Sequence, residues 1–282
     1  KSRLIDVDIY RCDYNNHKYL ILNFLIVKKM DENVLVKNLL PCVKEAGSKI
    51  IDIYNSKPNA EQKNDGSPVT IADKASEKII IKKIKSLYPS IPIVSEENPE
   101  SHNLKFLSEF FLVDPLDGTK EFLKFDGKGS FTVNIALIRE NEPLIGIVYA
   151  PAIKRLFYAG KTFGSFEENK DGIKKIRIRK SDKNKIVAVA SSSHLDQKTK
   201  DWLVKNNIAR TVSIGSSLKF CLVASGEADV YPRFGPTMEW DTAAGDAVLR
   251  YAGGRVEYLD GRKFTYGKKN FKNTPFIAKG DF

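Results

Sequence analysis

Carboxylates follow short apolar runs, or stand where a helix opens, at three places in the sequence. Glu96 follows one apolar run closely, and Asp114 and Asp117 share the turn D-P-L-D-G-T after another. Asp241 is the second residue of the segment W-D-T-A-A-G-D. Hard divalent cations such as Mg²⁺ take oxygen ligands and keep positions open for water and a substrate phosphate. Several carboxylates at one point repel each other and raise one another's pKa values. A cluster built from these segments therefore predicts bound cations.

The D-P-L-D-G-T turn suits this chemistry because its bend lets two carboxylates and the carbonyl of Leu116 converge on one small volume. Gly118 permits the turn, and a helix that begins at Thr119 points backbone N–H groups at a phosphate. Taken alone, an acidic pair after a strand is typical of a solvated loop, and an Asp at a helix start is typical of a cap. The joint pattern, with Lys63 and Asp73 upstream, argues against a purely structural interpretation.

The periodicities around these segments predict helices and strands that would position the carboxylates. Apolar residues at three- and four-residue steps predict helices over 35–53 and 70–87, the second with Thr70 as N-cap and Asp73 in its first turn. A third helix is expected at Trp202, and a last one from about Asp241 to a left-handed cap at Gly253. Strands are expected at 91–94, 111–113, 131–137, 144–149, 156–159, 176–178 and 186–190. This mixture predicts an α+β or α/β chain of two layered halves that meet between residues 160 and 185.

The amino-acid composition indicates the class of protein and the kind of metal site to expect. The chain has 282 residues, of which 42% are hydrophobic and 29% charged, which is typical of a soluble globular protein. Three cysteines, Cys12, Cys42 and Cys221, form no C-x-x-C pair and fit a reducing compartment. The three histidines are too dispersed for a zinc site, so a catalytic metal must be held mainly by oxygen.

The formal charge of +11 raises the question of nucleic-acid binding. The Lys and Arg residues are, however, spread along the chain, and their densest groups lie within amphipathic patterns typical of solvated faces. No zinc-finger, RRM or KH signature is present. We therefore expect no stable nucleic-acid complex, although the charge would help attract a small polyanionic substrate.

Residues 1–29 differ from the rest of the chain. Their longest apolar stretch, 19–27, is too short to span a bilayer, and no small-residue cleavage site follows it. We expect a poorly packed extension, with Met30 as a plausible native start. The expected location is the cytoplasm, with association with the inner face of the membrane left open.

Several segments together resemble one known family. These are D-P-L-D-G-T-K-E-F from Asp114, F-T-V-N-I-A-L from Phe131, G-S-S-L-K-F-C-L-V-A from Gly215, and Y-P-R-F-G-P-T from Tyr231, which leads into W-D-T-A-A-G from Trp240. The sequence resembles the lithium-sensitive, magnesium-dependent phosphatases of the inositol monophosphatase superfamily. Within it, the likeness is to the CysQ-type 3'(2'),5'-bisphosphate nucleotidases. The match covers about residues 30–282 and implies a layered α-β-α-β-α sandwich.

The resemblance also implies roles for individual residues around two or three Mg²⁺ ions. Glu96, Asp114, the Leu116 carbonyl, Asp117 and Asp241 are the implied metal ligands. The resemblance implies that Thr119 and Asp73 orient the attacking water and help to deprotonate it. Glu96 is implied to be catalytic as well. Lys63 is implied to support the loop beside the metals. The elementary chemistry agrees, because a metal-bound water is acidified and a hydroxyl backed by a carboxylate can accept its hydrogen bond.

Substrate identity depends on the second half of the chain. The resemblance implies a metal-binding subdomain over 30–170 and a substrate-binding subdomain over 171–282. The implied substrate contacts are Gly118, Thr119, His194, Ser216, Lys219, Arg233 and Asp241. A bisphosphate carries a second dianion away from the reaction centre, and a Lys with an Arg is the expected way to hold it. His194 fits a structural, hydrogen-bonded histidine equally well.

The sequence therefore predicts hydrolysis of adenosine 3',5'-bisphosphate to AMP and phosphate, an activity that serves sulfur assimilation. 3'-Phosphoadenylyl sulfate is a further candidate substrate. An inositol or sugar phosphate phosphatase of the same fold is the alternative enzyme, and a ribonucleotide-binding protein without catalysis is the alternative of another class. The expected partner is the small nucleotide substrate, with the chain as a monomer or homodimer.

Overall fold

The computed structural model describes residues 31–62, 68–105, 107–125, 129–191 and 196–282. The expectation for residues 1–29, and those for Lys63 and His194, lie outside the described residues. By internal contacts, Asp31–Phe282 forms one compact unit, and the description below concerns this unit. The division at residue 170 stays a prediction. Within the described ranges, no helix is both long and apolar enough to cross a membrane.

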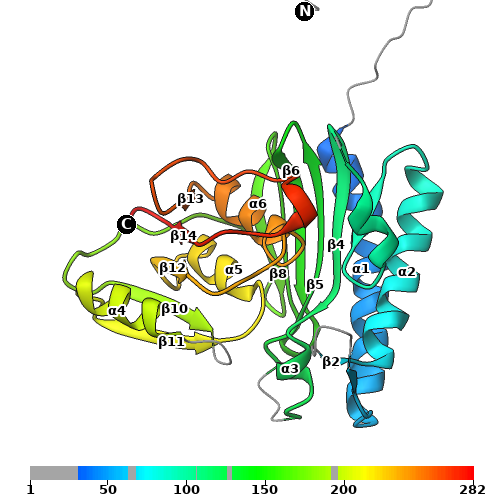
Figure 1. Cartoon of the computed structure of the whole chain (residues 1–282), viewed down its shortest axis with the longest axis horizontal. Coiled ribbons are helices and arrows are strands. Elements are labelled where there is room, and N and C mark those ends of the chain that lie inside the picture. Colours follow the sequence, from blue (N-terminus) through cyan, green and yellow to red (C-terminus); the bar gives the residue numbers. More distant parts are fainter. Residues whose placement is uncertain (1–30, 63–67, 106, 126–128, 192–195) are drawn as a thin grey trace, which may run out of the picture. The chain divides into compact units, whose positions relative to one another are not determined.

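A seven-stranded sheet, covered on one face by two long helices, forms the first part of this unit (Figure 1). The helices are α1 (Glu32–Asn55) and α2 (Ile71–Leu87). The strands are β3 (Ile93–Ser95), β4 (Glu109–Asp117), β5 (Thr132–Arg139), β6 (Glu142–Ala150), β7 (Arg155–Gly160), β8 (Gly164–Asn169) and β9 (Gly172–Ile176), in this spatial order. Only the β3–β4 pair is parallel in this sheet. Short pieces connect the larger elements: β1 (Glu61–Gln62), β2 (Pro68–Val69), α3 (Thr119–Phe122), and the 3₁₀ turns η1 (Pro99–Asn103), η2 (Pro151–Ile153) and η3 (Lys269–Phe271).

Two further helices cover the other face of that sheet and separate it from a second one. These helices are α5 (Leu218–Ala224) and α6 (Ala243–Tyr251). The second sheet has the order β11-β10-β12-β14-β13, and α4 (Gln197–Lys205) packs on its outer side (Figure 1). Its strands are β10 (Val187–Ser191), β11 (Arg210–Ile214), β12 (Val230–Arg233), β13 (Arg255–Tyr258) and β14 (Phe276–Lys279). The five layers confirm the expected α-β-α-β-α sandwich.

Helix starts follow the local chemistry of the sequence. The side chain of Asp31 caps α1 by accepting from the N–H groups of Asn33 and Val34 at 2.9 and 3.2 Å. Thr70 caps α2, as predicted, and forms a reciprocal capping box with Asp73. Pro41 lies inside α1, which remains one continuous helix.

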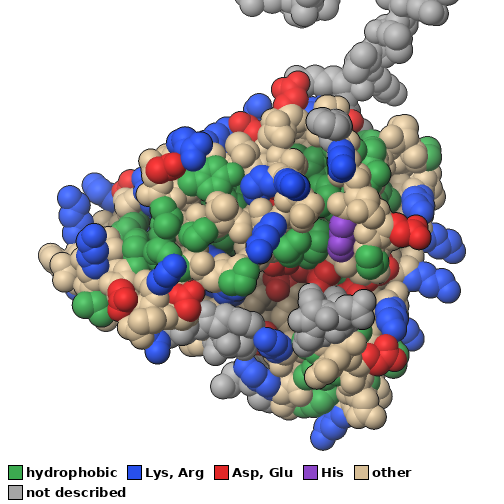
Figure 2. Space-filling view, in the orientation of Figure 1, with side chains coloured by type: hydrophobic (Ala, Val, Ile, Leu, Met, Phe, Trp, Pro, Cys, Tyr) green, Lys and Arg blue, Asp and Glu red, His purple; other side chains and the backbone are tan. Residues whose placement is uncertain are grey.

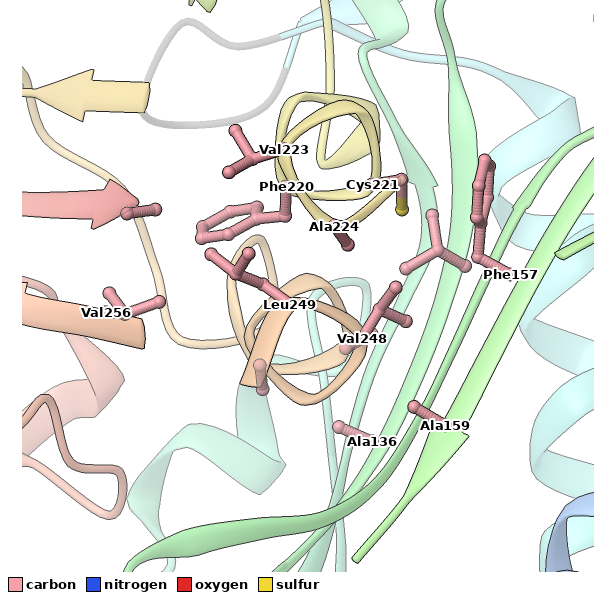
Figure 3. Packing of buried hydrophobic residues seen from close by; sticks show 14 of the residues in the cluster. Ala136, Phe157, Ala159, Phe220, Cys221, Val223, Ala224, Val248, Leu249 and Val256 are labelled. Carbon is pink, nitrogen blue, oxygen red and sulfur yellow. The ribbon is translucent and has the colours of Figure 1, made fainter. Parts of the chain in front are cut away.

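The main core fills the space between the seven-stranded sheet and the second sheet. Figure 3 shows Phe220 and Cys221 of α5 and Val248 of α6 pointing among residues of both sheets, with Phe157 on β7 and Val256 on β13. Both α5 and α6 are therefore held on two sides. This packing fixes the start of each helix, and the chain just before each start lines the candidate site.

Two local expectations need correction. The strand expected at 176–178 is β9, Gly172–Ile176, which pairs antiparallel with β8. The helix expected at Thr119 is a single turn of four residues, with Gly118 in the left-handed region at φ +93°. The last helix begins at Ala243, and Gly253 follows it at φ +101°, as expected for a left-handed cap.

Candidate active site

The three acidic segments meet at one cavity of about 290 Å³. Glu96 follows β3, Asp114 and Asp117 lie at the end of β4, and Asp241 stands just before α6. The ladder between β4 and β5 shifts register between Asp114 and Asp117, which places a bend where the sequence predicts a turn. Figure 2 shows acidic side chains within a hollow of the surface. The cavity is lined by Pro68, Glu96, Asp114, Leu116, Asp117, Gly118, Thr119, Lys120, Glu121, Ser191, Gly215, Ser216, Lys219, Phe220, Tyr231, Arg233, Pro236, Thr237, Asp241 and Thr242.

Burial and mutual repulsion raise the pKa values of Asp114, Asp117 and Asp241. Burial, with the charges of Glu96, Asp117 and Asp241, raises the pKa of Asp114 well above its usual range. Burial, with the charges of Asp117 and Glu96, likewise raises the pKa of Asp241 well above its usual range. Burial raises the pKa of Asp117 to about 7, although the nearby Lys219 ammonium and the Ser217 N–H oppose the shift. Hydrogen bonding with Glu96 adds a smaller upward contribution to the pKa of Asp114.

This donor set fits a hard divalent cation. The four predicted carboxylates, Glu121 and Leu116 line one cavity, and the ionised carboxylates need a positive partner to offset desolvation. Among the residues that the structure describes, no three His, Cys, Asp or Glu side chains already have the arrangement of a finished metal site.

A hydroxyl–carboxylate pair stands at the edge of the cavity. The Thr119 hydroxyl lies 3.2 Å from Asp73 Oδ1 and 3.2 Å from the Leu116 carbonyl oxygen. The other carboxylate oxygen of Asp73 accepts from the N–H and hydroxyl of Thr70 at 2.7 and 2.8 Å. The capping box of α2 therefore fixes Asp73 in place toward Thr119, as the sequence motif predicts.

Lys219 is buried in the cavity wall and does not lie on the open surface. The residue is 4% exposed, and its ammonium donates to the Ser216 carbonyl at 2.5 Å and lies 5.2 Å from the centre of the Tyr231 ring. Burial lowers the pKa of Lys219 to about 8, against the opposing charge of Asp117. Lys219 therefore offsets the charge of the carboxylates as well as facing the cavity.

Arg233, at the end of β12, is a second cation on the cavity wall. Its guanidinium donates to the carbonyls of Gly235 and Pro236 at 3.3 and 2.9 Å, which holds the side chain in one orientation. The structure thus brings together every predicted site residue except Lys63 and His194, which lie outside the described residues.

Sequence reasoning missed several residues of this site. Glu121 and Tyr231 line the cavity, and the Ser217 N–H donates to Asp117 Oδ2 at 2.5 Å across 100 positions of the chain. The Ser217 hydroxyl in turn donates to Asn134 Oδ1 at 2.6 Å. Their segments are conspicuous in sequence, but no local spacing shows that Asn134, Ser217 and Asp117 are neighbours.

Comparison with known proteins shows the class to which the fold and site belong. Residues 32–278 match the inositol monophosphatase family, and the chain belongs to that family. Its relatives include 3'(2'),5'-bisphosphate nucleotidase CysQ of Salmonella typhimurium, 41% identical over 246 residues that cover 86% of this chain and 98% of the relative. CysQ of Escherichia coli K12 is 43% identical over 237 residues, 83% of this chain and 94% of the relative.

Solved structures agree with this assignment. CysQ from Bacteroides thetaiotaomicron has a TM-score of 0.75 at 33% identity and covers 88% of this chain and 98% of its own. Thermotoga maritima IMPase shares the fold, with a TM-score of 0.74 at 23% identity over 89% and 93% of the two chains. Membership in the family implies a metal-dependent phosphatase.

Proposed function

We propose that this protein hydrolyses the 3'-phosphate of adenosine 3',5'-bisphosphate and releases AMP and phosphate. The observation that carries the proposal is the presence of Arg233 and Lys219 on the wall of the same cavity as four carboxylates. The carboxylates suit the reacting phosphate through cations, and the two basic residues suit a second phosphate that does not react. The similarity to CysQ nucleotidases supports this substrate.

Glu96, Asp114, the Leu116 carbonyl, Asp117 and Asp241 would hold two or three Mg²⁺ ions. Mg²⁺ held there would lower the pKa of a bound water and offset the negative charge of the phosphoryl group.

The chain's own groups then orient the nucleophile. Asp73 is fixed by the Thr70 capping box and accepts a hydrogen bond from the Thr119 hydroxyl. A hydroxyl has one proton and two lone pairs, so Thr119 keeps a lone pair that can accept a hydrogen bond from the attacking water. Glu96 would act with Thr119 and Asp73 as a catalytic residue, in addition to its role as a metal ligand.

The remaining contacts hold the nucleotide. Gly118 and Ser216 present backbone at the cavity, where Gly118 has φ +93° and an added Cβ would lie 3.2 Å from the Ser130 carbonyl oxygen. Arg233 and Lys219 would bind the 5'-phosphate, and His194 the nucleoside. We propose 3'-phosphoadenylyl sulfate as a further substrate, because it carries the same 3'-phosphate and its sulfate is attached to the 5'-phosphate.

Arg233 provides the cleaner test of substrate identity, because Lys219 is the strongest charge acting on Asp117, whereas Arg233 is the weakest of the influences on Asp241. A charge-assisted hydrogen bond contributes roughly 1.5–3 kcal/mol, or about ten- to a hundredfold. Arg233→Ala should therefore lower kcat/KM for adenosine 3',5'-bisphosphate by about that factor. It should scarcely change kcat/KM for adenosine 3'-monophosphate, which has no 5'-phosphate.

The matched control is Arg262→Ala, which removes an exposed arginine paired with Asp260. It should leave kcat/KM unchanged for both substrates. Equal losses on both substrates in Arg233→Ala would show that Arg233 supports the fold. An unaltered enzyme that prefers inositol 1-phosphate would replace the nucleotidase proposal with the inositol phosphatase alternative.

A further inference from the structure

His102, a half-buried residue of η1, contacts two segments that lie far apart in the sequence. Its Nε2 lies 2.8 Å from the carbonyl oxygen of Ser95. Its ring stacks on the indole of Trp240, with centroids 4.6 Å apart and planes inclined by 24°. Ser95 directly precedes Glu96, and Trp240 directly precedes Asp241. We propose that His102 is a positioning residue that holds Glu96 and Asp241 at the spacing the metal site requires.

The contact with Ser95 acts on the backbone of Glu96 through a rigid unit. The Ser95 carbonyl and the Glu96 N–H belong to one planar peptide group. His102 holds the carbonyl side of this group, and the Val113 carbonyl accepts from the Glu96 N–H at 3.1 Å. Because both sides of this group are held, the peptide plane is restrained from rotating, and the position of the Glu96 Cα is set.

Neighbouring groups brace the same turn without reaching the second segment. The Ser101 hydroxyl donates to the Asn98 carbonyl at 2.6 Å and accepts from the Ser95 N–H at 3.1 Å. Glu77 on α2 accepts from the Ser95 hydroxyl at 2.5 Å. These bonds stabilise the turn on its own side of the cavity, so they leave the distance to Asp241 unset.

The contact between His102 and Trp240 sets the spacing between the Glu96 turn and Asp241. Trp240 is 4% exposed and also packs near Phe271, with centroids 6.5 Å apart. The next residue, Asp241, is held by its own N-terminal turn, where its carboxylate accepts from the Met238 N–H at 2.8 Å. The ring stack therefore joins two turns that are each rigid, and it brings their carboxylates to one cavity.

The hydrogen bond also fixes the place of one proton on the His102 ring. A carbonyl oxygen can only accept, so Nε2 must carry a proton. Phe preserves the flat ring and loses the donor, whereas Gln preserves a donor and loses the stack. Ala removes both. These three substitutions separate the two contacts.

The proposal rests on the proposed function, because it assumes that Glu96 and Asp241 bind the metal. The test is calorimetric titration of Mg²⁺ into the substrate-free protein, with kcat and KM measured in parallel. The loss of one such contact corresponds to about two- to tenfold. We expect His102→Ala to weaken Mg²⁺ binding by about three- to tenfold, and His102→Phe and His102→Gln to lie between it and the unaltered chain.

The matched control is Tyr158→Ala, which removes a half-buried ring stacked on Phe166 in the seven-stranded sheet. It should lower the melting temperature and leave Mg²⁺ affinity unchanged. Mg²⁺ affinity within twofold of the unaltered chain in all three His102 variants would overturn the positioning role. If His102→Ala does not fold, the Phe and Gln variants decide the question by the same criterion.

Failure of the proposed function gives a different result. Asp117→Asn should abolish strong Mg²⁺ binding by the otherwise unaltered chain. If the unaltered chain and Asp117→Asn bind Mg²⁺ alike, the metal site itself is wrong, and the role of His102 is overturned with it.

Discussion

The Thr119 hydroxyl lies 3.2 Å from the Asp73 carboxylate, although 46 positions separate the two residues in the chain. Thr119 belongs to the single turn α3, and Asp73 belongs to the first turn of α2. Asp73 thus caps its own helix with one oxygen and faces Thr119 with the other. One carboxylate serves both the start of a helix and the orientation of a hydroxyl at the cavity.

Thr119→Val removes this hydroxyl and preserves the shape of the side chain. Removal of a group that orients the nucleophile should lower kcat by about 10²- to 10⁴-fold and leave KM nearly unchanged. Thr119→Ser keeps the hydroxyl and should retain most of the activity. Steady-state kinetics at saturating Mg²⁺ provide the check, and a Val variant within fivefold of the unaltered kcat would contradict the assigned role.

Asn134→Ala tests the buried network behind Asp117. Asn134 accepts from the Ser217 hydroxyl, which also lies 2.9 Å from the Thr132 hydroxyl, and all three residues are buried. Leaving such groups with fewer partners should cost about 1–3 kcal/mol of unfolding free energy. It should also lower kcat, because the Ser217 N–H that binds Asp117 loses its anchor.

Urea unfolding and phosphate release measure these two effects. Asn184→Ala, at an exposed turn, is the control and should change neither quantity. A stable Asn134→Ala protein with full activity would show that the network does not position Asp117.

Asp229→Asn probes the stability of the second sheet. Burial opposes ionisation of Asp229, but hydrogen bonds from Arg179, the Val187 N–H and Ser181 outweigh it and lower the pKa of the carboxyl group. The two Arg179 bonds measure 2.8 and 2.5 Å. The substitution should cost roughly 2 kcal/mol of unfolding free energy at pH 7.

The pH dependence of that difference follows from the lowered pKa. A carboxylate with a depressed folded-state pKa stabilises the fold above its unfolded value of about 3.9, and this contribution disappears as pH falls through the folded value. The gap between the unaltered chain and Asp229→Asn should therefore be constant near neutrality and shrink below about pH 4. Asp260→Asn, at an exposed pair, should show little effect. A gap that grows on acidification would contradict the assignment.

Local signals in the sequence predicted much of this fold. The stripes of α1 and α2, the Thr70 cap and the β5–β6 alternation depend on residues within one element, so periodicity reveals them. All seven residues of α5 are buried, so no polar face marks this helix in the sequence. The five layers followed from the family resemblance, because periodicity alone does not determine which faces meet.

The candidate site divides in the same way. Glu96, Asp114, Asp117 and Asp241 stand out because each lies at the end of an apolar run or the start of a helix. The burial of Lys219 depends on how α5 packs between the two sheets, and the bond from Ser217 to Asp117 joins the start of α5 to β4. No local pattern encodes either contact. The role of His102 likewise appears only when residues 95, 102 and 240 are seen together.

Phosphate release from adenosine 3',5'-bisphosphate and inositol 1-phosphate, measured side by side with Mg²⁺ and with chelator, tests the central claim most directly. The proposed site predicts a kcat/KM at least about tenfold higher for the bisphosphate, since only this substrate engages Arg233 and Lys219 with a second phosphate. Chelator should reduce both rates to background. A preference for inositol 1-phosphate, or an undiminished rate in chelator, would contradict a metal-dependent bisphosphate nucleotidase.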